Sequence, residues 1–164
     1  RDEKYVASAT GELKWNYKDN PYFTINTKGT KGAVGFVQNK TIELDGWKVE
    51  TENPFAVIFI TDLSKKGDLS VAEKILLTVV ARGRNTGMEY KYENNKAYLT
   101  RTGTDPLLLE PVIADISSET LSGYEVKVVD QDGRVTKKSI PVKNNTFSID
   151  GETDKTLYYL LIKK

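Results

Sequence analysis

The sequence predicts an all-β protein: an antiparallel β-sandwich, of jelly-roll or immunoglobulin-like type, formed by residues 1–164 as a single domain. Three observations carry this prediction. Turn dipeptides recur between short segments, apolar and polar residues alternate within those segments, and two continuous apolar runs lie in the middle of the chain. Short alternating segments separated by turn signals are typical of β-sandwiches and β-barrels.

The turn dipeptides divide the chain into hairpins. Asp45-Gly46 separates residues 41–44 from 47–50, and Asn94-Asn95 separates 88–92 from 97–100. A two-residue hairpin turn needs positive φ, which Asn and Gly adopt most readily, so we expect a β-hairpin at each place. The same signal recurs at Asp132-Gly133, Asn144-Asn145 and Asp150-Gly151.

The strands are predicted from residue periodicity. Leu13, Trp15 and Tyr17 alternate with polar residues and share one strand face. The runs at 55–60 and 75–80 are apolar throughout and rich in β-branched residues, which is typical of central strands. We expect one helical turn at 70–75, ahead of the second run.

A single domain is the favoured organisation, with a minor seam at the polar segment 117–123. The part of the chain beyond it has about 45 residues, too few for a comfortable separate core. We therefore place its short strands in the same sandwich and keep a two-lobed arrangement as the alternative.

Composition excludes several function classes. The 24 basic and 23 acidic residues are interspersed, with no basic stripe, so we expect no nucleic-acid partner. The longest apolar run is far shorter than the about 20 residues that cross a bilayer, so we expect no membrane partner. The chain has no Cys and no His, which removes Ser-His-Asp triads, cysteine nucleophiles and His-ligated metals. No carboxylate pair stands out as catalytic, and we expect no enzymatic activity.

Several phrases occur together in a characteristic order: Gly11-Glu-Leu-Lys-Trp15, the stretch 27–36 ending in Gly32-Ala-Val-Gly-Phe36, Ile75-Leu-Leu-Thr78, Asn85-Thr-Gly-Met88 and Pro106-Leu-Leu-Leu-Glu-Pro111. This order resembles the non-catalytic β-sandwich domain that follows the catalytic barrel in some bacterial multidomain glycoside hydrolases. One detail departs from that pattern, because Ala72 stands near the place where the family has Ser.

The resemblance implies a secreted, extracellular setting and an attached catalytic domain that carries the nucleophile and the acid. The predicted function is a non-catalytic carbohydrate-binding module acting on plant or microbial polysaccharide. The alternative is a structural accessory domain that packs against the catalytic barrel and has no ligand of its own.

Carbohydrate binding needs exposed aromatic rings, on which sugars stack, and neighbouring polar groups that bind hydroxyls. The candidate residues are Trp47, Tyr90, Tyr92, Trp15, Tyr17, Arg84 and Asn85. Each has a second interpretation. Trp15 suits core or interdomain packing, and the face shared by Tyr90 and Tyr92 suits half of the core. The arginines of the 82–87 loop suit ion pairs that hold the loop.

A structural calcium ion is left open, and no other cofactor is expected. Asp130-Gln-Asp132-Gly133 has part of the spacing of a calcium loop but lacks its later ligands. Asp62, Asp68 and Glu73 form a looser acidic group.

Overall fold

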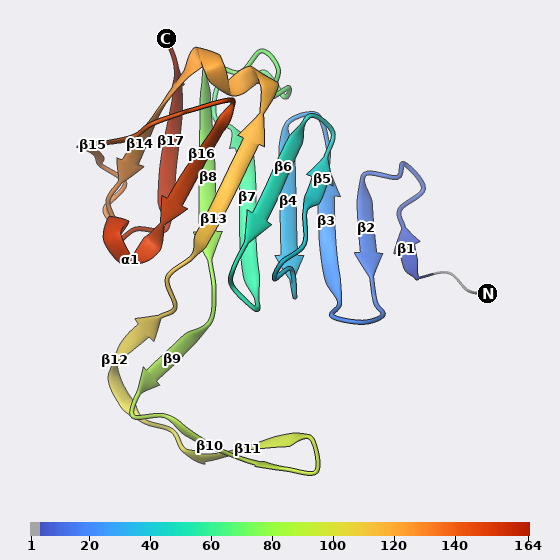
Figure 1. Ribbon diagram of the computed structural model, residues 1–164, viewed down its shortest axis with the longest axis vertical. Coiled ribbons are helices and arrows are strands. Elements are labelled where there is room, and N and C mark those ends of the chain that lie inside the picture. The colour runs from blue at the N-terminus through green and yellow to red at the C-terminus, as the bar shows by residue number, and fades with distance from the viewer. Residues whose placement is uncertain (1–3) are drawn as a thin grey trace.

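The computed structural model describes residues 4–164, which form two packed antiparallel sheets and a long projecting arm (Figure 1). The all-β sandwich predicted from the sequence is confirmed. Both apolar runs form adjacent strands of the larger sheet, as expected.

The larger sheet has nine strands and begins with the N-terminal strands. In spatial order it contains β1 (Tyr5–Ala7), β2 (Leu13–Asn16), β3 (Tyr22–Asn26), β4 (Thr30–Gly35), β7 (Ala56–Asp62), β8 (Lys74–Val80), β17 (Tyr158–Lys163), β14 (Tyr124–Val129) and β15 (Val135–Ile140). The C-terminal strand β17 thus lies between β8 and β14, which joins both halves of the chain in one sheet.

The smaller sheet has four strands and lies in front of the larger one in Figure 1. Its order is β16 (Thr146–Asp150), β13 (Ile113–Ser118), β6 (Trp47–Thr51) and β5 (Ile42–Leu44). The segment 117–123, predicted as a seam, contains the end of β13 and the 3-10 helix η1 (Glu119–Gly123), which leads from the smaller sheet to β14.

The core lies between the two sheets. Ile58 and Ile60 of β7 point into it, and so do Val49 of β6 and Ile116 of β13; all four are buried. The alternate residues of β7, such as Phe59, point to the opposite face of the nine-stranded sheet and are partly exposed. The continuous apolar runs therefore have one fully covered face and one face that no strand covers within residues 4–164.

The predicted turns are largely as expected. Asp45-Gly46 and Asn94-Asn95 have positive φ and close hairpins. Asn144-Asn145 closes a turn in which Lys143 and Thr146 exchange backbone hydrogen bonds of 2.8 and 2.9 Å.

Two local predictions are wrong. At Asp150-Gly151 the chain forms the single-turn helix α1 (Gly151–Asp154) instead of a hairpin, because the Asp150 carboxylate accepts hydrogen bonds from the backbone N–H groups of Glu152 and Thr153. Residues 70–73 form turns and bends instead of the helical turn expected at 70–75.

The arm comprises residues 83–109 and projects from one end of the sandwich (Figure 1). Its proximal part pairs β9 (Gly83–Thr86) with β12 (Thr104–Leu109), and its distal part pairs β10 (Glu89–Glu93) with β11 (Lys96–Arg101). Sequence periodicity predicted the distal hairpin but not its departure from the body.

Candidate functional site

The base of the arm is closed by an ion pair between its two ends. Arg82 donates to the Glu110 carboxylate through Nε at 2.7 Å and Nη2 at 3.1 Å, and Glu110 N donates to Arg82 O at 2.9 Å. The hydrogen bond from Arg82 is the main cause that lowers the pKa of Glu110. The same contact raises the pKa of Arg82, and Tyr92 adds to that rise electrostatically.

The chain that follows is fixed to the smaller sheet. The buried Asn53 donates from Nδ2 to Pro111 O at 2.8 Å and accepts from Ile113 N at 2.9 Å. A buried amide bonded on both sides holds its backbone partners in one geometry. The arm thus leaves the body from a rigid base.

Tyr90 and Tyr92 lie on one face of the distal hairpin. Tyr90 pairs with Leu99 and Tyr92 with Ala97, whereas Tyr98 pairs with Lys91 and so lies on the opposite face. The two tyrosine rings on the shared face have centroids 6.4 Å apart and are tilted by 39°. Tyr92 is 71% exposed and Tyr90 40%, so the interpretation of this face as half of the core is wrong.

Arg84 and Asn85 belong to the proximal part of the same arm. Arg84 is exposed and lies opposite Leu108. Asn85 donates from Nδ2 to Thr102 O at 3.0 Å, which holds the returning strand. The arginine that holds the loop through an ion pair is Arg82.

Trp15 and Tyr17 are far from the arm, near the N-terminal edge of the nine-stranded sheet (Figure 1). Their rings meet edge to face with centroids 5.9 Å apart. Trp15 is 52% exposed, and it pairs with Val6 on one side and Phe23 on the other. Core packing of Trp15, one of its two expected roles, is therefore wrong within this chain.

The surface around Trp15 is a continuous apolar face, which we call the outer face. Its members point away from the smaller sheet in two rows of paired residues: Val6, Trp15, Phe23, Val34 and Val57, and next to them Leu13, Ile25 and Phe59. Among these eight side chains the indole N–H of Trp15 is the one polar group, and beyond Phe59 the second row continues into Thr78 and Tyr158. The outer face has the chemistry of a protein contact more than that of a sugar site.

Trp47 is in the core. It is the first residue of β6, at the end of the sandwich opposite the arm, and only 4% of its surface is exposed. Its ring presents no open face for stacking. The structure thus brings Tyr90, Tyr92, Arg84 and Asn85 together on the arm and separates Trp15, Tyr17 and Trp47 from them.

Trp47 does contribute to a cavity of about 780 Å³ at that end of the sandwich, which we call the end pocket. The pocket lies between the Asp45-Gly46 turn, the loop 62–73 and η1. Its lining includes the otherwise buried Leu44, Leu69 and Lys31.

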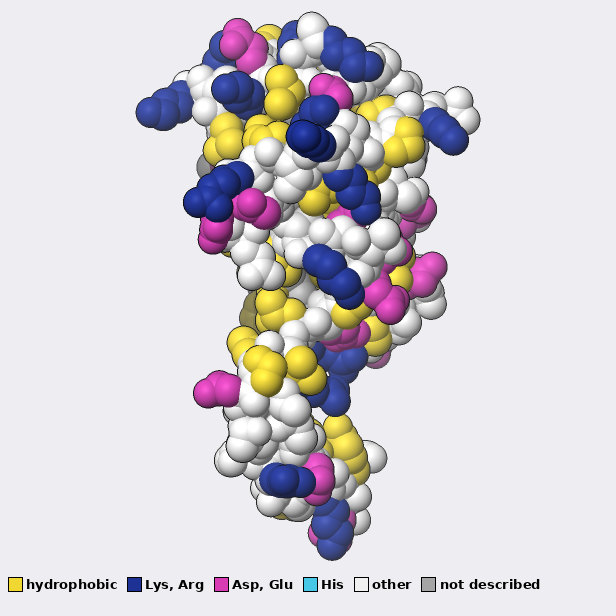
Figure 2. Space-filling model, turned by 90° about the vertical axis from the view of Figure 1, so that its left-hand side faces the viewer, with side chains coloured by type: hydrophobic (Ala, Val, Ile, Leu, Met, Phe, Trp, Pro, Cys, Tyr) yellow, Lys and Arg dark blue, Asp and Glu magenta, His cyan; other side chains and the backbone are white. Residues whose placement is uncertain are grey.

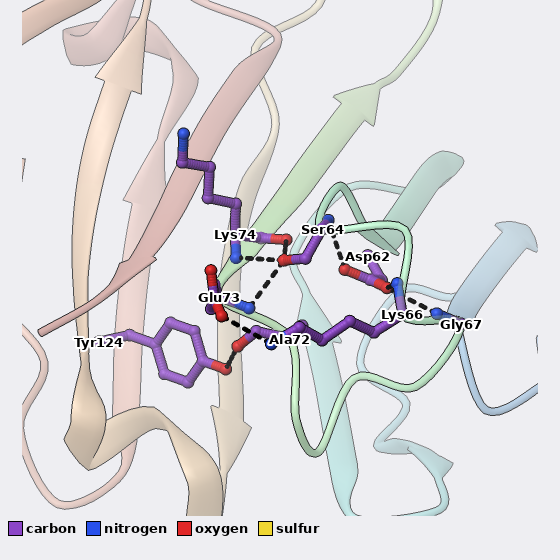
Figure 3. A network of polar contacts seen from close by, with 8 residues as sticks. All are labelled: Asp62, Ser64, Lys66, Gly67, Ala72, Glu73, Lys74 and Tyr124. Carbon is purple, nitrogen blue, oxygen red and sulfur yellow. Dashed lines mark hydrogen bonds and ion pairs between the residues drawn. The ribbon is translucent and has the colours of Figure 1, made fainter.

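Residues 68–70 of the loop 62–73 line the end pocket, and the parts of the loop on either side of them are held by the polar network of Figure 3. The Asp62 carboxylate accepts backbone N–H groups of Ser64, Lys66 and Gly67 at 2.6 to 2.8 Å. Partial desolvation raises the pKa of Asp62, but these hydrogen bonds outweigh it and leave the pKa below 3.8. Lys66 also pairs with Glu73 at 2.6 Å.

The acidic residues considered for calcium are engaged in these loops. Asp68 accepts hydrogen bonds from the backbone and hydroxyl of Ser70, and Asp130 accepts the backbone N–H groups of Asp132 and Arg134. Across residues 4–164 no three Asp or Glu side chains are grouped as metal ligands. In the same residues no helix has the length and apolarity needed to cross a membrane.

Sequence reasoning missed the apolar neck of the arm. Leu107, Leu108 and Leu109 are all largely exposed, and Figure 2 shows apolar side chains gathered where the arm leaves the body. It also missed Leu99 farther along the arm, whereas Tyr98 was among the aromatic residues considered for stacking. The sequence pattern of Pro106-Leu-Leu-Leu-Glu-Pro111 is that of an ordinary buried strand. No residue within the segment indicates that it is exposed.

No family model, curated protein or solved structure matches this chain. The functional argument therefore rests on the geometry of the arm, the outer face and the end pocket.

Proposed function

We propose that the protein is a non-catalytic carbohydrate-binding module that holds glycan chains on the Tyr90–Tyr92 face of its arm. The observation that carries the proposal is that two neighbouring tyrosine rings, 6.4 Å apart, are presented to solvent on the same face of an anchored ribbon. In a secreted polysaccharide-degrading enzyme, such a module raises the concentration of an attached catalytic domain near its substrate.

Stacking explains why two tyrosines suit this ligand. The C–H faces of sugar rings are apolar and flat, and an aromatic ring covers them while its hydroxyl stays in water. The rings stand on a paired ribbon whose base is closed by Arg82 and Glu110, so little conformational freedom is lost on binding. Arg84, exposed on the same arm, is a donor for sugar hydroxyls.

The exposure of the arm also needs an explanation beyond folding. A two-stranded ribbon with both faces in water gains little from its own burial. Tyr92 and Leu99 nevertheless remain exposed on it. Apolar side chains kept at such a cost to local stability are typical of a binding surface.

A catalytic role has less support. The acid of a glycosidase has a raised pKa, which burial in an apolar site supplies. The carboxyl groups of residues 4–164 whose pKa departs from its ordinary value are all shifted downward, as for Glu110, Glu125 and Asp150.

Affinity electrophoresis and pull-down with cellulose, mixed-linkage glucan, xylan, mannan and β-1,3-glucan test the proposal. We expect retention by at least one class and an about tenfold loss of affinity for Tyr92→Ala, since a lost ring contact is worth about 1.4 kcal/mol. Tyr98→Ala is the matched control because it removes the same side chain from the opposite face. Absence of retention by every polysaccharide, or equal losses in both variants, contradicts the proposal.

The second candidate function is a structural domain that packs against a catalytic barrel, and the outer face favours it. Trp15, Leu13 and Val6 form an exposed apolar surface at one end of that face. On this hypothesis Trp15 fluorescence is shielded from acrylamide in a chain that carries the catalytic domain and is quenched in the present chain. Equal quenching in both chains contradicts it.

A further inference from the structure

Lys31 has an unusual position for a lysine. It belongs to β4, its side chain lies between the two sheets, and only 3% of the residue is exposed. Its Nζ donates to Asn26 Oδ1 at 2.7 Å and lies 3.6 Å from Asp45 Oδ2. Burying an ammonium group is costly unless its hydrogen bonds are satisfied, and an ammonium group has three donors.

The N–H donors of Lys31 that Asn26 does not use lie at the end pocket. The contact with Asp45 is an ion pair that is too long for a good hydrogen bond, so only the Asn26 contact uses a donor fully. Lys31 lines the pocket, and the Asp45 side chain is 83% exposed at its rim. A ligand hydroxyl that accepts from Lys31, and a neighbouring hydroxyl that donates to Asp45, would satisfy the remaining hydrogen-bonding capacity of both side chains.

The charges of the pocket favour a neutral ligand. Lys31 faces Asp45, and Lys48 pairs with Glu43 at 3.3 Å. These pairs leave little net charge to attract an ion. The lining also includes Lys28, Asp68 and Glu119, so that it holds three lysines and four carboxylates in all. The remaining polar groups are hydroxyls and amides, such as those of Thr120 and Asn145.

The pocket also has an apolar part. Trp47, Leu44 and Leu69 lie in the lining and contribute only the small parts of their surfaces that remain exposed, 4%, 1% and 2%. A cavity of about 780 Å³ is in the range of small-molecule sites. An apolar floor with a few directed polar groups is the usual composition of such sites.

The walls of the pocket are preorganised. The loop 62–73 is held by the Asp62 and Ser64 hydrogen bonds of Figure 3, and the Asp45-Gly46 turn is fixed by its hairpin. On the third side, Ser118 caps η1 by accepting from Thr120 N. Rigid walls reduce the entropy lost when a ligand binds.

We propose that the end pocket binds the terminal sugar residue of a neutral glycan, with Lys31 and Asp45 as the groups that hold adjacent hydroxyls. The ligand class rests on the proposed function, whereas the site is independent of the arm. A pocket with walls on three sides accepts a chain end, whereas the flat Tyr90–Tyr92 face accepts the interior of a chain. The two sites lie at opposite ends of the sandwich (Figure 1).

An NMR titration of the whole chain tests the site, with cellobiose, xylobiose, mannobiose and laminaribiose as probes. We expect at least one disaccharide to shift the backbone amide signals of Gly46, Leu69 and Thr120. Lys31→Met should weaken this binding at least tenfold, and Asp45→Ala should do the same. The partner Asp45 is 83% exposed, so Lys31→Met leaves no buried charge unpaired and is expected to fold. The exposed Asp45 provides a second variant in any case.

Two controls separate this proposal from the first. Lys137→Met removes an exposed lysine outside the pocket and should leave the titration unchanged. Tyr92→Ala should also leave it unchanged, even where it abolishes polysaccharide retention. The proposal is overturned if no disaccharide shifts the pocket amides, if shifts occur only at the arm, or if both pocket variants bind like the parent chain.

Discussion

The hydroxyl of Tyr124 donates a 2.6 Å hydrogen bond to the carbonyl oxygen of Ala72. This contact ties the first residue of β14 to the end of the loop 62–73, across 52 positions of sequence. Both residues are buried, and burial raises the pKa of the Tyr124 phenol. The loop that carries the pocket residues 68–70 is therefore tied to a strand from the C-terminal part of the chain.

The first prediction concerns this hydrogen bond. Tyr124→Phe removes the donor and leaves the buried Ala72 carbonyl without its partner, so the free energy of unfolding should fall by about 1–2 kcal/mol. Urea unfolding measures the change, with an unaltered m-value. Tyr98→Phe, on the exposed arm, is the control. A loss no larger than that of the control means that the hydrogen bond gives no net stability.

The second prediction concerns pH and Asp62. Its pKa is lower in the folded protein than its ordinary value of 3.8, because the hydrogen bonds to the loop outweigh desolvation. The unfolded chain therefore binds the proton more readily, and the stabilisation is present above the ordinary pKa and lost as pH falls through the folded one. The stability difference between the parent and Asp62→Asn should shrink over that acid range.

Urea unfolding at a series of pH values below 6 measures this difference. Asp132→Asn, which removes an exposed carboxylate from another turn, is the matched control. A constant difference between the parent and Asp62→Asn at every pH contradicts the role given to the carboxylate charge.

The third prediction separates the two tryptophans, which are the only two in the chain. Trp15 is half exposed on the outer face and Trp47 is buried in the core. In Trp47→Phe the remaining emission should be red-shifted and strongly quenched by acrylamide. In Trp15→Phe it should be blue-shifted and protected. Similar quenching constants in the two variants would contradict the placement of both residues.

The sequence carries enough local information for the sandwich but too little for the surfaces. Asp45-Gly46 and the run at 75–80 were predicted correctly because positive φ and continuous apolar character are local properties. Alternation at Tyr90 and Tyr92 was ambiguous, since a strand face looks the same in sequence whether core or water covers it. The end pocket was not predicted, because Lys31, Leu69 and Thr120 come together only through the packing of distant segments.

The last prediction concerns the base of the arm. Glu110→Gln replaces the carboxylate that Arg82 binds through two nitrogens, which weakens the link between the two ends of the arm. The pair is partly exposed, so its contribution is at most about 1 kcal/mol. Backbone amides of β9 and β12 should then exchange hydrogen up to about fivefold faster, since 1 kcal/mol corresponds to that ratio. Mass spectrometry of peptides from residues 83–109 measures the exchange.

Glu93→Gln is the matched control for this experiment, because Glu93 pairs with Lys91 near the tip of the same arm and does not join its ends. Faster exchange at β9 and β12 in Glu110→Gln alone identifies the Arg82–Glu110 pair as the anchor of the arm. Reduced polysaccharide retention in that variant, with Tyr90 and Tyr92 intact, would further connect anchoring to binding, since a looser ribbon loses more freedom when it holds a chain. Identical exchange in both variants would assign the anchoring to Asn53 and the backbone contacts instead.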